Sequence, residues 1–286
     1  MAGTMMNTAI SDDEFLLLRD LIKAHSGIAL SESKRLLLQA RLAKRLRQLG
    51  LQSYREYYDY LVQRDVGASE RDGFINALTT NTTAFFREPY HFEYLAQVWL
   101  PAQRARARPG VLRSLRIWSS ACSTGEEAYS LAITLSEALQ PRSGWQPYLL
   151  ASDIDTDALD TARAGVYAQS RVVTVPEPLR RRYFQTGTGG LAGLVRVAPK
   201  IRAMVTFERI NVLGDLRPGL TRFDCIFCRN LAIYFDGPTQ QQLVKRLATV
   251  LQPGGLLVLG HSESLLGHGS CFRPLGKTMF QLDQTP

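Results

Sequence analysis

Polar side chains follow the apolar, strand-like runs of this sequence at the points where those runs end. The run LRIWSS leads into a turn of small residues and then into Glu126 and Glu127 at the start of a predicted helix. Small residues let a ligand approach the backbone, and carboxylates at a helix start repel phosphate. This segment therefore favours a cationic or hydroxyl-rich ligand over a pyrophosphate.

A second run, YLLASD, ends in Asp153, and Asp155 follows two residues later. An acid at this position of an α/β sheet can accept both hydrogen bonds of a ribose diol, which is typical of a nucleoside site. For part of the segment a structural alternative is adequate, in which Asp155 or Thr156 caps the next helix.

Two further segments carry polar residues that a packed core does not need. One strand-like run ends in Arg229 and Asn230, and Tyr234 follows after three intervening residues. These residues could hold the polar tail of a cofactor and form a platform for a substrate. Earlier in the chain, LTTNTTAFFRE places polar residues before two phenylalanines and Arg87, which does not suit a core helix. The alternative is a capped helix start with Arg87 in an ordinary ion pair.

The elements that would position these residues alternate between strand and helix. The strand-like runs are LRIWSS, YLLASD, MVTFERIN, FDCIFCRN and LLVLGH, and the helical segments cover about 125–139, 157–165 and 239–251. This alternation predicts a mostly parallel, doubly wound α/β sheet with its ligand at the carboxyl ends of the strands. Residues 272–282 predict two short antiparallel strands at one edge of the sheet.

Helical signals dominate the first 80 residues. S-x-x-E capping boxes stand at 11–14 and 53–56, a weaker version stands at 69–72, and Gly50 suits a helix end. These signals predict a small all-α domain.

The predicted domains are three. Residues 1–80 form the helical domain, 81–110 a linker and helix, and 111–286 the α/β domain. Within the last, a stretch at about 171–200 with a glycine loop at 187–193 predicts an inserted, small antiparallel β-subdomain.

The predicted helix over about 33–49 has an apolar and a basic face. The leucines expected in the core are Leu36, Leu38, Leu42, Leu46 and Leu49. Six cations with no acid between them occupy other positions: Lys34, Arg35, Arg41, Lys44, Arg45 and Arg47. Such a row would attract an acidic partner, although a solvated helix face explains it equally well.

Composition narrows the class of protein. The net charge of +8 over 286 residues indicates an acidic partner, whether nucleic acid, anionic lipid or a glutamate-rich protein surface. No run approaches the roughly 18 apolar residues of a membrane span, and the N-terminus is acidic where a signal peptide is basic, so a cytoplasmic protein is expected.

The CxxC pair, Cys225 and Cys228, lies in a strand-like run that points the two side chains to opposite faces, so buried thiols are expected rather than a metal or redox site.

Five segments resemble, in order and spacing, the CheR-type chemotaxis receptor methyltransferases, which esterify glutamates using S-adenosylmethionine. They are LTTNTTAFFRE, IWSSACSTGEEAYSLAI, LASDID, FDCIFCRNLAIYFD and LLVLGHSE, and the resemblance covers about residues 11–282. It implies a helical domain, an S-adenosylmethionine-dependent α/β methyltransferase domain that needs no metal, and a β-subdomain that docks on the receptor. It also suggests an edge strand at the glycine hairpin 187–193 that captures a receptor tail by strand addition, which an exposed edge strand at 194–197 could support. The alternative is that this hairpin is a solvent loop.

The resemblance further implies which residues contact the cofactor, whose product is S-adenosylhomocysteine. These are Asn81, Thr83, Arg87, Glu127, Asp153, Asn211, Val212, Arg229 and Asn230. A substrate glutamate is already a carboxylate at neutral pH and needs no general base. The hypothesis is that Arg87 orients this carboxylate and that Tyr234 holds it or the methyl group, while His261 is structural. The basic helix would bind the acidic methylation helices of the receptor.

Two other functions compete with this one. The basic pI suits a nucleic-acid methyltransferase, but the chain has no [DNS]-P-P-[YF] element and no Pro-Cys nucleophile. A non-catalytic receptor-binding module could keep the fold, although the full set of polar strand ends argues against it. A nucleic-acid partner is therefore not expected. Membrane insertion is not expected either, because the sequence has no apolar run long enough for a membrane span.

Overall fold

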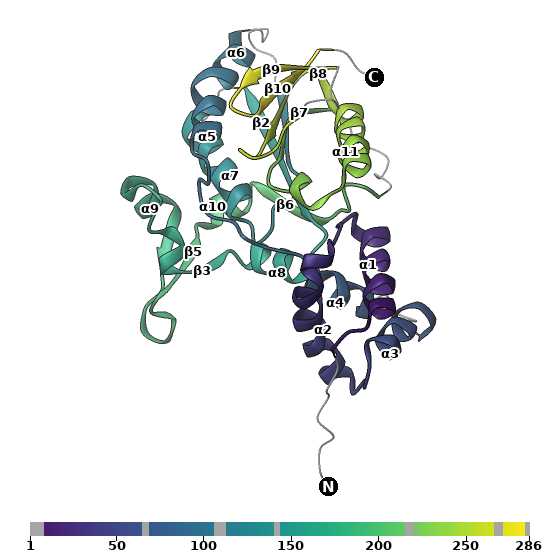
Figure 1. Cartoon of the computed structure of the whole chain (residues 1–286). Helices are drawn as coiled ribbons and strands as arrows, with labels where there is room; N and C mark the ends of the chain where they lie inside the picture. The colour runs from purple at the N-terminus through teal and green to yellow at the C-terminus, as the bar shows by residue number, and fades with distance from the viewer. Residues whose placement is uncertain are drawn as a thin grey trace. The chain divides into compact units, whose positions relative to one another are not determined.

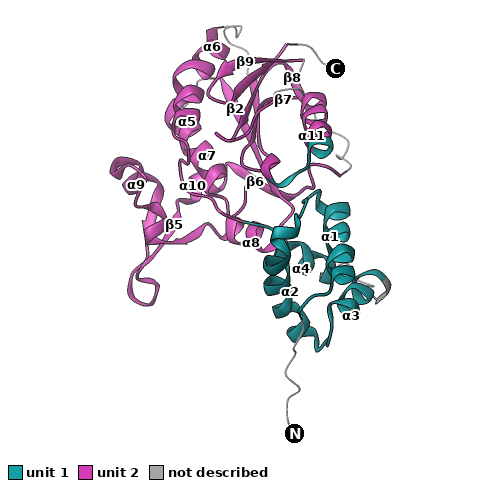
Figure 2. Ribbon diagram, viewed as in Figure 1, with its two compact units in different colours: residues 1–80, 234–239 teal, residues 81–233, 240–286 magenta. Residues whose placement is uncertain are grey.

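A computed structural model describes residues 9–64, 69–105, 113–139, 144–214, 220, 222–265 and 271–283. The chain forms two compact units (Figure 2). The first comprises Met1–Thr80 with Tyr234–Thr239, and the second comprises Asn81–Ile233 with Gln240–Pro286. The described part of the predicted linker, residues 81–105, thus belongs to the second unit. Residues 106–110 of that linker lie outside the described residues.

The first unit is helical. Its elements are α1 (Asp12–Ser26), a 3₁₀ turn (Glu32–Lys34), α2 (Arg35–Leu49), α3 (Tyr54–Asp59), a π-helical turn (Tyr60–Arg64) and α4 (Ser69–Leu78). Local sequence explains these boundaries, because Ser11 and Glu14 form the predicted capping box and Gly50 ends α2 in the left-handed conformation. At the second predicted box, Ser53 caps Glu56 N, but the Glu56 carboxylate accepts from Gln52 N instead of returning to Ser53.

Helix α2 buries fewer leucines than the sequence predicts. Leu38, Leu42 and Leu46 are fully buried and Leu49 is partly buried. The prediction is wrong for Leu36, which is 76% exposed. At about 100° per residue, Leu36 lies roughly 200° around the helix from Leu38, on the opposite face.

A seven-stranded sheet forms the centre of the second unit, with the order β6-β2-β1-β7-β8-β10-β9. The strands are β1 (Arg113–Ser119), β2 (Trp145–Asp153), β6 (Val205–Arg209), β7 (Phe223–Cys228), β8 (Leu251–Leu259), β9 (Phe272–Gly276) and β10 (Met279–Leu282). The first five pair in parallel, and β10 pairs antiparallel with β8 and β9. The predicted α/β sheet and its antiparallel edge are confirmed.

Helices cover both faces of this sheet. Figure 1 shows α5 (Tyr90–Tyr94) and α7 (Glu126–Ala138) on one side and α11 (Gly237–Val250) on the other. The other α-helices in the described part of the unit are α6 (Leu100–Ala105), which a π-helical turn (Leu95–Trp99) joins to α5, and α8 (Thr156–Ala164), α9 (Glu177–Tyr183) and α10 (Pro199–Arg202). Cys225 and Cys228 are fully buried free thiols in β7, as their alternation predicts.

A separate three-stranded antiparallel sheet has the order β3-β5-β4. Its strands are β3 (Val166–Ala168), β4 (Phe184–Thr186) and β5 (Leu194–Val197). The small sheet therefore begins before residue 171, where the sequence places its start. The expectation of an edge strand at 194–197 is wrong, because β5 pairs with β3 on one side and β4 on the other.

Candidate functional site

Neighbouring parallel strands bring the polar strand ends of the second unit together. β1 lies between β2 and β7, with Ser119 in register with Ala151 on one side and Phe227 on the other. The turn after β1, Asp153 at the end of β2, and Arg229 and Asn230 after β7 consequently share one edge of the sheet. This is the edge at which ligands of such sheets bind.

The turn after β1 is held by Asp153. Ser123 N donates to Asp153 Oδ2 at 2.7 Å, and Asp155 N donates to Asp153 Oδ1 at 3.0 Å. The amide of Ile154 also bonds this carboxylate. A carboxylate has about four acceptor sites, so Asp153 retains acceptor capacity for a ligand hydroxyl. Burial raises the pKa of Asp153, and the backbone hydrogen bonds oppose that rise.

Gly125 in this turn is required by packing as well as by conformation. Its φ is +98°, and a Cβ placed there would lie 2.8 Å from Ala162 Cβ and 3.0 Å from Tyr167 Oη. The sequence suggested that small residues here admit a ligand. At Gly125 the space is taken by α8 and β3 instead.

Asn81 reaches the same strand ends through Asp155. Its Nδ2 donates to Asp155 Oδ2 at 2.7 Å, and its Oδ1 accepts from Ser123 Oγ at 3.3 Å. Asp155 also accepts from Ala158 N as the N-cap of α8, which confirms the structural alternative for this residue. Sequence reasoning missed its second contact, because Asp155 and Asn81 are 74 residues apart.

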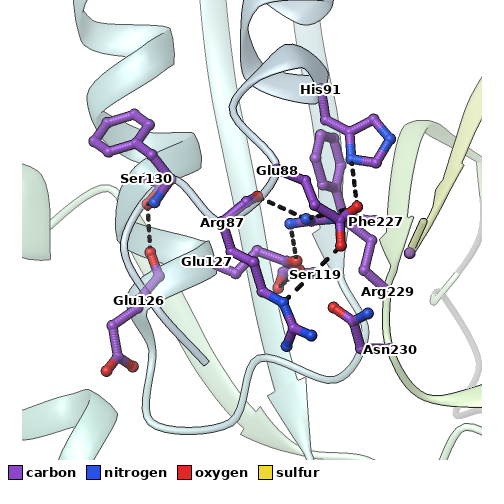
Figure 3. A network of polar contacts seen from close by, with 12 residues as sticks. Arg87, Glu88, His91, Ser119, Glu126, Glu127, Ser130, Phe227, Arg229 and Asn230 are labelled. Atoms are coloured by element: carbon purple, nitrogen blue, oxygen red, sulfur yellow. Dashed lines mark hydrogen bonds and ion pairs between the residues drawn. The ribbon is translucent and has the colours of Figure 1, made fainter. Parts of the chain in front are cut away.

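Arg229 lies at the centre of a buried ionic network (Figure 3). Its guanidinium is within 2.9 Å of Glu127 and 3.2 Å of Glu88, and it faces the Phe92 ring. Glu127 also accepts from Ser119 Oγ at 2.7 Å. Burial raises the pKa of Glu127, and Arg229 and Ser119 oppose that rise.

The Arg229 side chain is only 1% exposed. Its guanidinium is surrounded by protein groups, so a cofactor contact at position 229 would have to come from the backbone. Glu88, which sequence reasoning did not single out, is the second acid of this network. Burial favours a higher pKa for Glu88, but Arg229 and the hydrogen bond from His261 outweigh it and lower the pKa to about 2.

The segment that carries Arg87 is held on several sides. Phe86 and Glu88 have positive φ values of 53° and 57°. Phe86 N donates to Ser130 Oγ at 2.9 Å, and Arg87 Nη1 donates to Thr82 O at 2.9 Å. Such backbone conformations persist only where surrounding contacts hold them, and they concentrate at functional sites.

The Arg87 side chain is one-third exposed, and its Nε lies 3.9 Å from Glu88. The ordinary ion pair offered as the alternative for Arg87 is thus long. Thr83, in the same segment, is partly buried.

Glu126 and Glu127 have different surroundings despite their shared position at the helix start. Glu126 is fully buried and pairs with Arg171 and with Thr124 Oγ1. Arg171 follows β3, so Glu126 ties α7 to the small sheet.

Asn211 and Val212 follow β6. Asn211 Oδ1 accepts from Leu213 N at 3.0 Å, while Val212 is buried and its carbonyl accepts from Arg246 Nε at 3.1 Å. β6 pairs with β2, so these residues follow the strand beside the one that ends in Asp153.

Tyr234 belongs to the first unit. It ends a short 3₁₀ helix (Ala232–Tyr234), and its carbonyl accepts from Ala29 N at 2.9 Å. Asp236 pairs with Lys23 at 2.6 Å, and the hydrogen bonds from Lys23 and Thr239 lower the pKa of Asp236 to about 2.

The six cations of α2 and the turn before it divide into two groups. Arg35 pairs with Glu32 and Asp12, Arg41 donates to the carbonyls of Leu78 and Thr79, and Arg45 pairs with buried Glu70. Lys34, Lys44 and Arg47 are exposed. The basic row is therefore partly structural.

His261 is largely exposed, and its Nδ1 lies 3.0 Å from Glu88 Oε1. This contact agrees with the hydrogen-bonded role expected from the sequence. In the described part of the chain, no three His, Cys, Asp or Glu side chains are grouped so as to hold a metal ion.

The donor set at this edge of the sheet fits S-adenosylmethionine. Asp153 has acceptor capacity for a ribose hydroxyl. Glu127, whose carboxylate already binds Ser119 and Arg229, makes the start of α7 unfavourable for a phosphate. The amides of Asn81 and Asn230 supply both donors and acceptors.

Comparison with known families agrees with this chemistry. The model described as "CheR methyltransferase, SAM binding domain" matches residues 81–280, and "CheR methyltransferase, all-alpha domain" matches 13–79. The chain belongs to the CheR methyltransferase family. It therefore has an S-adenosylmethionine-binding domain.

Curated relatives of this CheR-family chain align over nearly its whole length. It is 46% identical to "Chemotaxis protein methyltransferase 2" of Pseudomonas aeruginosa, over 94% of this chain and 92% of the relative. It is 44% identical to "Chemotaxis protein methyltransferase" of Klebsiella aerogenes, over 99% and 93%, and 41% identical to that of Escherichia coli, over 96% and 93%. Among the described residues, no helix is long and apolar enough to cross a membrane.

Proposed function

We propose that this protein transfers the methyl group of S-adenosylmethionine to glutamate side chains of chemoreceptor signalling helices, in the cytoplasm. Membership of the CheR family supports the reaction class, and the names of the relatives support the role in chemotaxis. The observation that carries the proposal is the convergence of Asp153, Glu127 and Asn230 at adjacent strand ends, with the Arg87 segment bonded to Arg229.

The bound cofactor would supply an electrophilic methyl group. The protein's task is then to orient the glutamate carboxylate, which is already ionised at neutral pH, and such positioning can be worth about 7–11 kcal/mol. Arg87 is proposed to orient that carboxylate, because a guanidinium binds carboxylates in a fork geometry and this one is partly exposed. Tyr234 is proposed to hold the carboxylate or the methyl group.

Asp153 is proposed to bind the ribose through its remaining lone pairs, and Glu127 to face the positive end of the cofactor. Asn81, Thr83, Arg87, Asn211, Val212, Arg229 and Asn230 are proposed to complete the cofactor contacts. At position 229 the contact is assigned to the backbone, because the side chain is buried in its ion pairs.

Receptor binding is proposed to use the exposed cations Lys34, Lys44 and Arg47, with the bonded Arg35, Arg41 and Arg45 in a structural role. An acidic methylation helix complements such charges, and the association should weaken with salt. A receptor tail, if it docks by strand addition, would pair with an outer strand of the small sheet, β3 or β4.

The test is transfer of labelled methyl from S-adenosylmethionine to a receptor fragment with glutamate-rich helices, followed by mild alkali. Alkali-labile label on glutamate is the expected result, because a carboxyl methyl ester hydrolyses readily. A fragment with those glutamates changed to alanine is the control. Label on nucleic acid instead, or cofactor binding without transfer to any receptor fragment, would contradict the proposal.

A further inference from the structure

Glu263 is a buried carboxylate that accepts three backbone hydrogen bonds. It belongs to the segment LLVLGHSE and is one of four buried acids among the described residues of the second unit. Oε2 accepts from Asn230 N at 2.8 Å and from Gly260 N at 2.6 Å, while Oε1 accepts from Ala232 N at 2.7 Å. One side chain thus joins the chain after β8 to the chain after β7.

The segment that Glu263 holds has an unusual backbone. Asn230 has a φ of +57°, a left-handed conformation that asparagine adopts more readily than most other non-glycine residues. Ala232 begins the 3₁₀ helix Ala232–Tyr234, and its carbonyl accepts from Gln240 Nε2 at 2.9 Å. Both of the amides that Glu263 binds in this segment therefore belong to a turn in which Asn230 is left-handed.

Gly260 provides the space for this arrangement. A Cβ at Gly260 would lie 2.4 Å from Asn230 Nδ2 and 2.9 Å from both Asn230 N and Glu263 Oε2. The Gly260–Glu263 turn closes through Glu263 N, which donates to Gly260 O at 2.9 Å. The glycine of GHSE thus leaves room for the hydrogen bonds that the glutamate of GHSE makes to Asn230.

We infer that Glu263 is a positioning residue of the methyltransferase site, which fixes Asn230 and the start of the segment leading to Tyr234. The inference rests on the proposed function for the roles of Asn230 and Tyr234. Glu263 itself touches neither cofactor nor substrate in this assignment. Its carboxylate fixes the backbone of Asn230, a proposed cofactor contact. Supporting hydrogen bonds orient the side chains of an active site in the same way.

Glutamine cannot replace this carboxylate. Both oxygens of Glu263 face backbone N–H groups, whereas an amide offers one acceptor and turns its own N–H₂ toward the remaining donor. Glu263→Gln should therefore release Asn230, Ala232 or both. A displacement of about 1 Å at a reacting site can cost roughly 10²-fold in rate, so a loss of 10- to 100-fold in kcat/KM is expected.

The experiment compares Glu263→Gln with the matched control Glu93→Gln, whose glutamate is exposed. Amide hydrogen exchange is followed at Asn230 and Ala232. Calorimetry measures the affinity for S-adenosylhomocysteine, and a methyl-transfer assay measures kcat/KM. Glu263→Gln should lose protection at Asn230, at Ala232 or at both, bind S-adenosylhomocysteine more weakly and turn over more slowly. The control should match the wild-type protein.

Two results would overturn the inference. One is a folded Glu263→Gln variant with wild-type exchange, affinity and rate. The other is fast exchange of Asn230 and Ala232 in the wild-type protein itself, which needs no variant and covers the case in which Glu263→Gln does not fold. Failure of the proposed function would differ from both, because the wild-type protein would then transfer no methyl to glutamate.

Discussion

Arg229 donates a hydrogen bond of 2.6 Å from Nη2 to the backbone carbonyl of Arg87, 142 residues earlier in the chain. The same guanidinium pairs with Glu127 at the start of α7. The end of β7, the first turn of α7 and the segment that presents the Arg87 side chain are therefore joined through one buried cation. A substitution that breaks the contacts of Arg229 in any one of these three segments should therefore displace the other two.

Arg229→Met should destabilise the protein by about 3–5 kcal/mol, because it leaves the carboxylates of Glu127 and Glu88 without their buried partner. Urea unfolding measures the loss. The double variant Arg229→Met/Glu127→Gln should recover part of it, since one uncompensated charge is removed. A loss below about 1 kcal/mol for the single variant would mean that water already screens this network.

Arg87→Ala should lower kcat by about 10²-fold, the scale expected when a group that orients a reacting charge is removed. Arg87→Lys should recover only part of the rate, because an ammonium cannot form the two-pronged contact. Single-turnover methyl transfer to a receptor fragment measures both. Full turnover by Arg87→Ala would exclude Arg87 from orienting the substrate.

Asp153→Asn should weaken S-adenosylhomocysteine binding by about 10- to 100-fold, equivalent to the 1.5–3 kcal/mol of hydrogen bonds to a charged group. The amide also turns a donor toward Ser123 N or Asp155 N, both of which donate to Asp153. Asp157→Asn, at an exposed acid in the same region, is the control. Equal calorimetric affinities for the two variants would argue against a ribose contact at Asp153.

Lys44→Glu/Arg47→Glu should raise the KM for a receptor fragment about tenfold at low ionic strength, and less at high salt where charges are screened. Arg45→Met should act differently. It leaves Glu70 buried without its cation, so it should lower the free energy of unfolding. If the double reversal left KM unchanged at low salt, these two cations would not contact the receptor.

His91 should make stability depend on pH in a defined window. Burial lowers the pKa of His91 from 6.5 to about 4, so between these values the unfolded chain binds a proton that the folded protein does not. The free energy of unfolding should therefore fall as pH decreases from 6.5 to about 4, by at most about 1.4 kcal/mol per pH unit.

Urea unfolding at several pH values tests this dependence, with His91→Asn as the comparison. The variant should be less stable near neutral pH, because it disturbs the contact of His91 Nε2 with Lys277 O, but its slope in this window should be smaller. Parallel slopes for the two proteins would assign the dependence to other groups.

Local sequence was sufficient for most elements because their signals act over a few residues. The Ser11 capping box, the Gly50 helix end and the alternation of β7 with its two buried cysteines all appear as predicted. The α/β class, the helical N-terminal region and the antiparallel edge strands followed from the same periodicities.

Strand partners were harder to predict than strands. Residues 194–197 form a strand, as expected, but its place in the middle of the small sheet depends on β3, a three-residue strand with little signal of its own. Leu36 illustrates the same limit in a helix, since its spacing from the other leucines suggested burial while its angular position leaves it exposed.

The sequence by itself determined the family, the classes of element and the set of polar residues at the strand ends, because these depend on local spacing and on motif order. Only the tertiary structure decided how those residues are used. Arg229 forms buried ion pairs with Glu127 and Glu88, and Arg45 forms one with Glu70. Glu263 binds the backbone of a neighbouring strand end. Arg45 and Glu70 are 25 residues apart along the chain, and Arg229 and Glu127 are 102 apart. A buried charge selects its partner by proximity in the folded protein, which no local pattern specifies.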